Sequence, residues 1–490
     1  MKKNRIINFL ALAVLVVGCQ DAIDIRQPGI LDASAAFQSV DDLNDGLQGA
    51  YDLMDVTAEI HHASVFTDEI RIGYDNGGQG IQLYAFNLTP ANAGPVTVWA
   101  RGYQTLGRIN RILEAAPNID ATGREVERDN ILGQCYAIRA WANHQMLSYF
   151  TTDYRDDNAL GIPLIDFVAP TDIAPLRNTN GEIYAAIEDD LTQAAALIQD
   201  QNSDIFFSRD AVNALRARVA AYRGQYNVAA PLAQQLLTAY PLAEPTDYNN
   251  MFNDTGIGEV IFKLERTLND SWDGQGNTGS NAAGGWAGAS YAFTGPGLTG
   301  APYYEMATGL WQSYDPSDQR RDENALEFIN VPLAGGRDVY VVNKYRGQER
   351  PLMNDLKLFR SSEMLMILAE AAADAGNLNN TPNSVAGLLQ QIRTARFGSA
   401  QPFPNFANAT AAWGAIVDER RIEFAFEGHR YKDLKRLGVL ANRQVSRTQN
   451  DCAASGACTL PTTDFRFTWP IPQAEFNGNP GLRAQQNPGY

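Results

Sequence analysis

Apolar residues that recur at the spacing of an α-helix constrain the fold of this chain more than any other feature. One stripe consists of Cys135, Ile138, Ala142, Met146 and Tyr149, because residues three or four positions apart lie on the same face of a helix. The sequence therefore predicts a mainly α-helical fold. Comparable patterns predict further helices over residues 38–56, 97–116, 183–198, 209–223, 226–239, 360–375, 383–396, 410–427 and 429–437.

Two of the predicted helix pairs, at residues 211–241 and 360–396, have small and aromatic residues at spacings typical of tetratricopeptide repeats. Small residues allow two helices to approach closely, and Gly224 lies where the first pair must turn. Long inserts separate the pairs, so the chain is not a regular solenoid, and a tandem-repeat scaffold that only binds proteins is a minor alternative. Strand-like stretches are few and short, the clearest being 258–264 and 338–345.

The first 18 residues have the organisation of a secretory signal. A basic start precedes residues 6–17, which are apolar except for Asn8. This run of about twelve residues is too short for a spanning helix, which needs about 20. Gly18 and Cys19 follow, and this junction resembles a bacterial lipobox, which implies cleavage before Cys19 and a diacylglycerol on its thiol. An ordinary signal peptide with a chance cysteine is the alternative.

The chain is acidic, with a formal net charge of −17. A nucleic-acid binder needs a basic face that displaces phosphate counterions, and docking on anionic lipid needs a polybasic patch. The charge argues against both classes of partner. Charged residues make up only 19% of the chain, so much of the surface must be neutral and polar.

The cysteines agree with export. Cys452 and Cys458 are separated by a loop of small residues that can bring their side chains together, which predicts a disulfide in an oxidising compartment. A metal site is the alternative, but no second pair of cysteines or histidines lies nearby. Cys135 falls on the apolar face of its helix and is predicted to be an inert buried thiol.

Two loop-rich segments carry the residues that suit a ligand. The smaller one, residues 66–86, offers Tyr74 and Asn76 among four glycines. Flat rings cover the apolar face of a sugar while polar side chains bond its hydroxyls, so both segments predict an oligosaccharide site. In the alternative, the rings pack inward and hold a long loop against the helices. The larger segment, residues 266–310, offers the rings of Trp272, Trp286, Tyr291, Tyr303 and Tyr304.

Three C-terminal stretches stand out. They are FRSSEMLMILAEA at residues 359–371, ERRIEFAFEGHR at residues 419–430, and the pair WPIPQ at 469–473 with QNPGY at 486–490. Together they resemble the SusD/RagB family of surface nutrient-binding lipoproteins. The likeness covers residues 19–490 and implies one SusD-like domain after a signal peptide of residues 1–18. It implies an α/α superhelix of tetratricopeptide-type helix pairs, with long irregular loop inserts and a few short strands.

The same resemblance implies a function. Such proteins sit on the outer membrane, cap a SusC-like TonB-dependent transporter, and deliver oligosaccharides or, in some members, peptides. It implies no catalytic residues, no metal and no cofactor. The principal hypothesis is a lipid-anchored, surface-exposed protein that binds an oligosaccharide non-covalently. A peptide ligand in the same role is the alternative.

Residues 419–430 look catalytic, because Glu427 and His429 stand two positions apart. Residues at that spacing point to different sides of a helix, so structural ion pairs at the edge of the core are the better interpretation. His61 and His62 lack the spaced carboxylates or cysteines of a metal site and are predicted to lie at the surface. The sequence has no His-Glu-x-x-His, Walker or Gly-x-Ser-x-Gly motif. A glycan-cleaving enzyme is the remaining alternative, since two catalytic acids need only meet in the fold.

Overall fold

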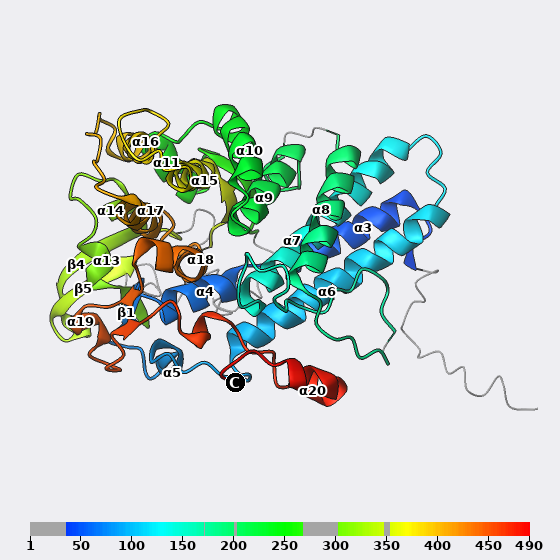
Figure 1. Ribbon diagram of the computed structural model, residues 1–490, viewed down its shortest axis with the longest axis horizontal. Coiled ribbons are helices and arrows are strands. Elements are labelled where there is room, and N and C mark those ends of the chain that lie inside the picture. The colour runs from blue at the N-terminus through cyan, green and yellow to red at the C-terminus, as the bar shows by residue number, and fades with distance from the viewer. Residues whose placement is uncertain (1–35, 171, 200–202, 268–301, 347–352) are drawn as a thin grey trace, which may run out of the picture.

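The computed structural model describes residues 36–170, 172–199, 203–267, 302–346 and 353–490. The predicted signal residues 1–18 with Cys19, and the rings of Trp272, Trp286 and Tyr291, fall outside these ranges. In the described part, helices form most of the core and short strands pair two by two (Figure 1). The predicted mainly α-helical fold is confirmed. None of the described helices combines the length and the apolar character that crossing a membrane requires.

Long helices of the N-terminal half pack side by side at one end of the molecule (Figure 1). They are α3 (Val40–Tyr51), α6 (Ala93–Ala115), α7 (Glu125–Phe150) and α8 (Asn180–Leu197). Helix α7 extends well beyond the predicted stripe, and the side chains of Cys135, Ile138 and Met146 are fully buried. Helix α8 begins at a capping box, in which the Thr179 side chain accepts a hydrogen bond from the backbone N–H of Glu182.

Helices of the remaining chain form contacting pairs. They are α9 (Arg209–Tyr222), α10 (Tyr226–Ala239), α15 (Ser361–Asp374), α16 (Val385–Phe397), α17 (Ala409–Glu423) and α18 (Arg430–Ala441). The first pair turns at Gly224, whose φ of +72° lies in the left-handed region that glycine adopts without strain. Helix α15 packs against both α10 and α16, so the two helix pairs predicted from the sequence contact each other.

Two predicted helices differ from the structure at their ends. The expected helix over 38–56 ends at Tyr51, and a separate helix, α4 (Thr57–Phe66), follows. The expected helix over 410–427 ends at Glu423, because Phe426 has a φ of +64° and Gly428 a φ of +81°, which a right-handed helix cannot contain. The chain turns there and begins α18 in a new direction.

Short strands join segments that are distant in the sequence. They pair as β1 (Ile70–Ile72) with β3 (Tyr304–Met306), β2 (Val260–Leu264) with β6 (Leu356–Arg360), β4 (Ala325–Val331) with β5 (Arg337–Val342), and β7 (Val445–Ser446) with β8 (Thr459–Leu460). The predicted strands at 258–264 and 338–345 are confirmed as β2 and β5. Strands β1, β4 and β5 lie at the end of the molecule opposite to α3 (Figure 1).

Short helices complete the described part of the chain. They are α5 (Ile81–Tyr84), η1 (Ala116–Asn118), α11 (Pro245–Phe252), α13 (Thr308–Trp311), α14 (Arg320–Asn324), η2 (Pro332–Ala334), α19 (Gln449–Cys452), η3 (Phe465–Phe467), α20 (Glu475–Gly478) and η4 (Pro480–Gln485). A disulfide joins Cys452 to Cys458, as the sequence predicts. Cys135 is a free thiol, and burial raises its pKa, which agrees with an unreactive side chain.

The C-terminal WPIPQ stretch is part of the core. Trp469 is fully buried and stacks on Tyr149, with 4.0 Å between the ring centroids. Its indole N–H donates to Nε2 of His62 over 2.9 Å. The prediction that His62 lies at the surface is therefore wrong, because its ring is only 1% exposed and fills the space between α4 and Trp469. Burial lowers its pKa well below the usual range.

Candidate functional site

The two loop-rich segments singled out in the sequence meet in the fold. Strand β1 from the first segment and strand β3 from the second are antiparallel, with Arg71 opposite Glu305 and Ile72 opposite Tyr304. The pairing continues past the strands, since the backbone N–H of Gly73 donates to the Tyr303 carbonyl over 2.8 Å. One continuous surface therefore includes residues that lie more than two hundred positions apart in the chain.

The buried side chain of Asn76 holds the backbone of the glycine-rich loop at this surface. Its side chain is 3% exposed, and its amide donates to the carbonyls of Gln79 and Tyr303 over 2.9 and 3.0 Å. Its amide oxygen accepts from the backbone N–H of Gly78 over 3.0 Å. All three bonds hold the glycine-rich loop, in contrast to the ligand contact expected from the sequence.

Tyr304 also points into the protein. Its ring is 2% exposed and lies edge-on to His61, with 5.5 Å between the ring centroids. A Cβ atom at Gly80 would lie 2.1 Å from the Tyr304 hydroxyl, so the loop approaches this ring as only a glycine can. Burial raises the pKa of Tyr304 to about 12. The sequence offered Tyr304 as a ligand contact, with inward packing as the alternative, and the structure buries this ring because β3 turns it inward. Tyr303 is partly buried against the core.

Tyr74 is the described aromatic residue of these segments that faces solvent. Its side chain is 55% exposed. One edge of the ring lies against the turn between β4 and β5, where a Cβ at Gly335 would be 3.2 Å from the ring. The loop after β1 and the β4–β5 turn thus form one surface, with an open aromatic face available to a ligand.

Arg71, Arg337 and Glu305 fix the strands that carry this surface. Glu305 is fully buried, and its carboxylate accepts from Nε and Nη2 of Arg71 over 2.9 and 2.7 Å, and from Arg337. Burial raises the pKa of Glu305, while the two guanidinium groups act in the opposite direction. Arg71 donates further to the Thr308 hydroxyl and to the Asp338 carbonyl. One arginine thereby ties β1, β3 and β5 together.

A layered stack continues from this ion pair. The Arg71 guanidinium lies 4.8 Å from the ring centroid of Tyr340, which stacks on Trp311 at 5.0 Å and 19°. The Arg321 guanidinium lies over the Trp311 ring, 4.4 Å from its centroid. Sequence reasoning missed the two rings because Trp311 lies one residue beyond the aromatic segment and Tyr340 lies in a predicted strand. The run of apolar and β-branched residues around Tyr340 was the signal available in the sequence.

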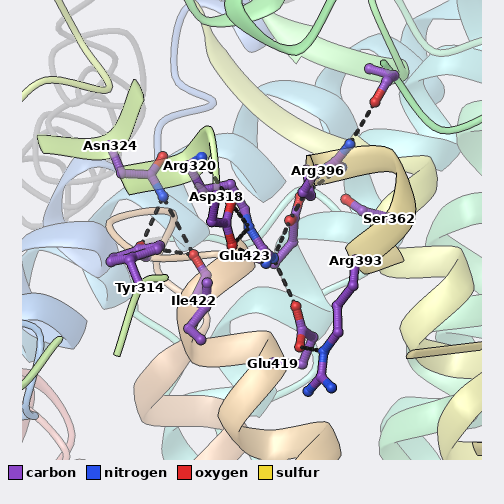
Figure 2. Close-up of polar contacts among 12 residues, drawn as sticks. Tyr314, Asp318, Arg320, Asn324, Ser362, Arg393, Arg396, Glu419, Ile422 and Glu423 are labelled. Atoms are coloured by element: carbon purple, nitrogen blue, oxygen red, sulfur yellow. Dashed lines mark hydrogen bonds and ion pairs between the residues drawn. The ribbon is translucent and has the colours of Figure 1, made fainter. Parts of the chain in front are cut away.

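The Glu419–Arg430 motif is structural, as predicted. Figure 2 shows Arg320 and Arg396 converging on Glu423 of α17, and Arg360 binds the same carboxylate. These groups are at most 2% exposed. Burial by itself raises the pKa of Glu423, but the three guanidinium groups outweigh this effect and hold that pKa well below its usual range.

The network also supports the candidate surface. Arg320 begins α14, which leads directly into β4, so the ion pairs anchor the β4–β5 hairpin to α17 (Figure 2). Glu427 and His429 have separate structural partners. Glu427 forms ion pairs with Lys344 and Arg360, and the His429 ring stacks on Phe424 with 4.7 Å between the ring centroids. Within the described ranges, the structure has no group of three or more His, Cys, Asp or Glu side chains that could hold a metal ion.

Two family models match this chain. The model of the SusD family matches residues 337–490. A second model, described as starch-binding and associating with the outer membrane, matches residues 29–220. The two matched regions do not overlap, and together they cover more than half of the chain.

Individual proteins align over nearly the whole length. SusD-like protein P2 of Formosa agariphila is 24% identical over 544 aligned residues, covering 100% of both chains. A SusD superfamily structure from Bacteroides thetaiotaomicron has a TM-score of 0.76 at 22% identity, covering 92% of this chain and 100% of that one. A laminarin-binding SusD-like protein has a TM-score of 0.68 at 20% identity, covering 93% and 100%. The helical fold, the C-terminal motifs and the family-model matches in both halves of the sequence all point to one family. This chain therefore belongs to the SusD family.

Proposed function

We propose that this protein is a lipid-anchored protein of the cell surface that binds a neutral oligosaccharide without altering it. It then delivers the ligand to a SusC-like TonB-dependent transporter in the outer membrane. One observation carries the proposal: β1 and β3 bring together the two segments whose residues suit a sugar, and Tyr74 keeps an open ring there.

Binding in this proposal needs no bond-making residue. The Tyr74 ring covers the apolar face of a sugar, and Trp272, Trp286 and Tyr291 of the adjoining segment add further rings. The strands below are rigid, because buried Glu305 holds Arg71 in a fixed position. A prearranged surface loses little conformational entropy when it binds, so a modest number of contacts yields useful affinity.

The comparisons support a glycan as the first ligand to test. One matched family model is described as starch-binding, and one structural neighbour is described as laminarin-binding. The arginines beneath this surface are also already engaged, since Arg71 and Arg337 both pair with the buried Glu305. A neutral ligand suits such a surface better than a strongly charged one.

Calorimetric titration of the purified protein with laminarin and starch oligosaccharides, and with mixed peptides, tests the ligand class. We expect heat with at least one glycan, and a Tyr74→Ala variant that binds about tenfold more weakly, for a loss of about 1.4 kcal/mol. The melting temperature should stay nearly unchanged, because the ring is largely exposed. Phe403→Ala is the matched control, since Phe403 is similarly exposed at 49% and belongs to neither segment.

Three outcomes would contradict the proposal. Heat of binding with the peptides and none with the glycans would indicate a peptide ligand instead of a sugar. Unchanged affinity in Tyr74→Ala and in the variants Trp272→Ala, Trp286→Ala and Tyr291→Ala would remove the site. Shortened products after incubation with a bound glycan would make the protein an enzyme.

The anchor and the transporter are tested in cells. A Cys19→Ala variant should no longer be found in the membrane fraction, because the acyl chains proposed on Cys19 supply the attachment to the membrane. Affinity purification of the unaltered protein from detergent extracts should bring down a TonB-dependent transporter. Membrane attachment that survives Cys19→Ala would contradict the lipid anchor.

A further inference from the structure

A small polar chamber lies where the N-terminal and C-terminal halves of the chain meet. Residues of α4, α7 and α9 line one side of it, and residues of β6, α18 and the turn before α18 line the other. Its volume is about 20 Å³, and one water molecule needs roughly 10 to 15 Å³ on the same measure. We call it the junction chamber. Its polar and charged lining residues are Glu59, Gln145, Arg218, Lys357, Glu427, His429 and Lys432.

Most charged groups of the junction chamber already have partners outside it. The Arg218 guanidinium donates to both carboxylate oxygens of Glu363. Lys357 forms an ion pair with Asp254, and Glu427 has the two ion pairs described above. These groups therefore need no further charge inside the chamber. None of the described residues that line it belongs to the two segments of the candidate surface, so the chamber is separate from the proposed oligosaccharide site.

Lys432 is the exception among these charges. Its side chain is only 7% exposed, and within the described ranges its ammonium group has neither a hydrogen bond nor an ion pair. The centroid of the Tyr149 ring lies 5.3 Å from Nζ, but the ring face offers no oxygen or nitrogen acceptor. An ammonium group carries three N–H donors, and leaving buried donors unpaired costs free energy. Lys432 therefore needs acceptors in the chamber that it lines.

Glu59 is the second group with unused bonding capacity. Its Oε1 accepts from the Gln145 amide over 3.0 Å, and no other side chain that the structure describes bonds to this carboxylate. Burial raises the pKa of Glu59 and lowers that of Lys432 to about 8, and the opposite charge of each group acts against this shift in the other. The two buried side chains thus interact electrostatically, although no ion pair joins them.

We propose that the junction chamber binds ordered water, which accepts from the Lys432 ammonium group and donates to the Glu59 carboxylate. Water is neutral and both donates and accepts, so it suits a buried cation and a buried anion together. An anion in its place would meet Glu59 and Glu427, and a cation would meet Arg218, Lys357 and Lys432. A bridging water is nearly as favourable in enthalpy as a direct hydrogen bond. The water thereby links α4, which leads into β1 of the candidate surface, to α18 of the C-terminal half.

The test is a crystal structure of the purified protein, fine enough to show ordered water, from crystals grown in sodium chloride and in sodium bromide. We expect in both a water peak within about 3.2 Å of Lys432 Nζ, and no anomalous bromide signal in the chamber. A bromide signal would make this an anion site. A direct contact between Lys432 and Glu59 would leave no role for water, and a dry chamber would leave the ammonium group unbonded. Each of these three results would overturn the proposal.

A Lys432→Met variant tests the ammonium group. Methionine is unbranched and of similar length but carries no charge, so the water should lose its hydrogen-bond donor and its peak should disappear. The melting temperature should also fall, because Glu59 loses the opposite charge. Lys435→Met is the matched control, since Lys435 lies one turn further along α18, does not line the chamber, and donates to the carbonyls of Ser148 and Thr151. The water peak should survive in the control.

A double variant, Glu59→Gln with Lys432→Met, keeps the test informative if Lys432→Met alone does not fold. It leaves neither unpaired charge in the chamber, and removing both partners of a buried pair costs less than removing one. Its melting temperature should therefore lie above that of Lys432→Met. A double variant that loses the full sum of the two single effects would overturn the proposal, as would a water peak that persists unchanged in Lys432→Met.

Discussion

The indole N–H of Trp469 donates a 2.9 Å hydrogen bond to Nε2 of His62, and this bond links the C-terminal stretch to the second N-terminal helix of the described chain. Both rings are buried, and the Trp469 ring stacks on Tyr149 at the same time. The C-terminal motif thus contributes to the packing of the core.

A Trp469→Phe variant should lose about 3 kcal/mol of unfolding free energy. The smaller ring leaves a cavity, and His62 loses the donor to its buried nitrogen. Urea unfolding followed by circular dichroism measures the change. Trp413→Phe is the matched control: Trp413 is also buried at 5%, but its indole makes no hydrogen bond with the described residues, so the loss should be smaller. Equal losses in the two variants would contradict a contribution from the bond.

A Glu423→Gln variant should be strongly destabilised, by about 3 to 5 kcal/mol. The substitution removes the buried carboxylate that Arg320, Arg360 and Arg396 share, and loss of one partner from a buried ion-pair network is costly. The measurement is again the free energy of unfolding in urea. Glu127→Gln is the contrasting variant, because its ion pair with Arg124 is exposed and screened by water, so its loss should hardly change the unfolding free energy. A small loss in Glu423→Gln would show that the network is dispensable for stability.

A Gly80→Ala variant should lose about 2 kcal/mol of stability. The φ of Gly80 is +63°, which strains any residue with a side chain, and the new Cβ would collide with the Tyr304 hydroxyl. In a Tyr304→Phe background the same change should cost less, because the colliding oxygen is gone. A double-mutant cycle of melting temperatures measures this coupling. Additive effects would mean that the backbone strain acts alone.

Unfolding free energy should fall as the pH drops from 7 to 5. All four histidines of the chain are held neutral by burial, which lowers the pKa of His61 to about 4 and those of His62, His144 and His429 well below the usual value. The unfolded chain binds protons below about pH 6.5 while the folded chain does not, so acid favours unfolding. Each histidine contributes at most about 1.4 kcal/mol per pH unit. Thermal unfolding across this pH range provides the measurement.

Buried acids whose pKa is raised, such as Glu69 and Glu305, oppose this trend. Burial raises the pKa of Glu69 to about 7, so the folded chain takes up a proton there at a higher pH than the unfolded chain does. That group stabilises the fold as the pH falls from 7 toward its unfolded value. Each of the four histidines takes up most of a proton in the unfolded chain between pH 7 and 5, so we expect them to dominate and the net slope to remain positive with pH. A flat profile would contradict the buried neutral histidines.

Much of the frame was predictable because helical periodicity is local. The stripe at Cys135, Ile138 and Met146 lies within one helix, and its burial follows from spacing alone. The interleaved charges of α17 likewise indicated ion pairs, because neighbouring turns of one helix show which side is apolar. The end of that helix at Glu423 was not predictable, since it depends on backbone angles at Phe426 and Gly428.

The sequence by itself determined the helices, the disulfide, the family and the two segments rich in ligand-compatible residues. Only the tertiary structure decided that those segments pair through β1 and β3, that Tyr304 turns inward, that Asn76 bonds its own loop, and that Tyr74 stays open. The physical reason is that periodicity reports contacts within a few turns of chain. The burial of a single ring depends instead on which distant segment packs against it, and that partner is chosen by the whole fold.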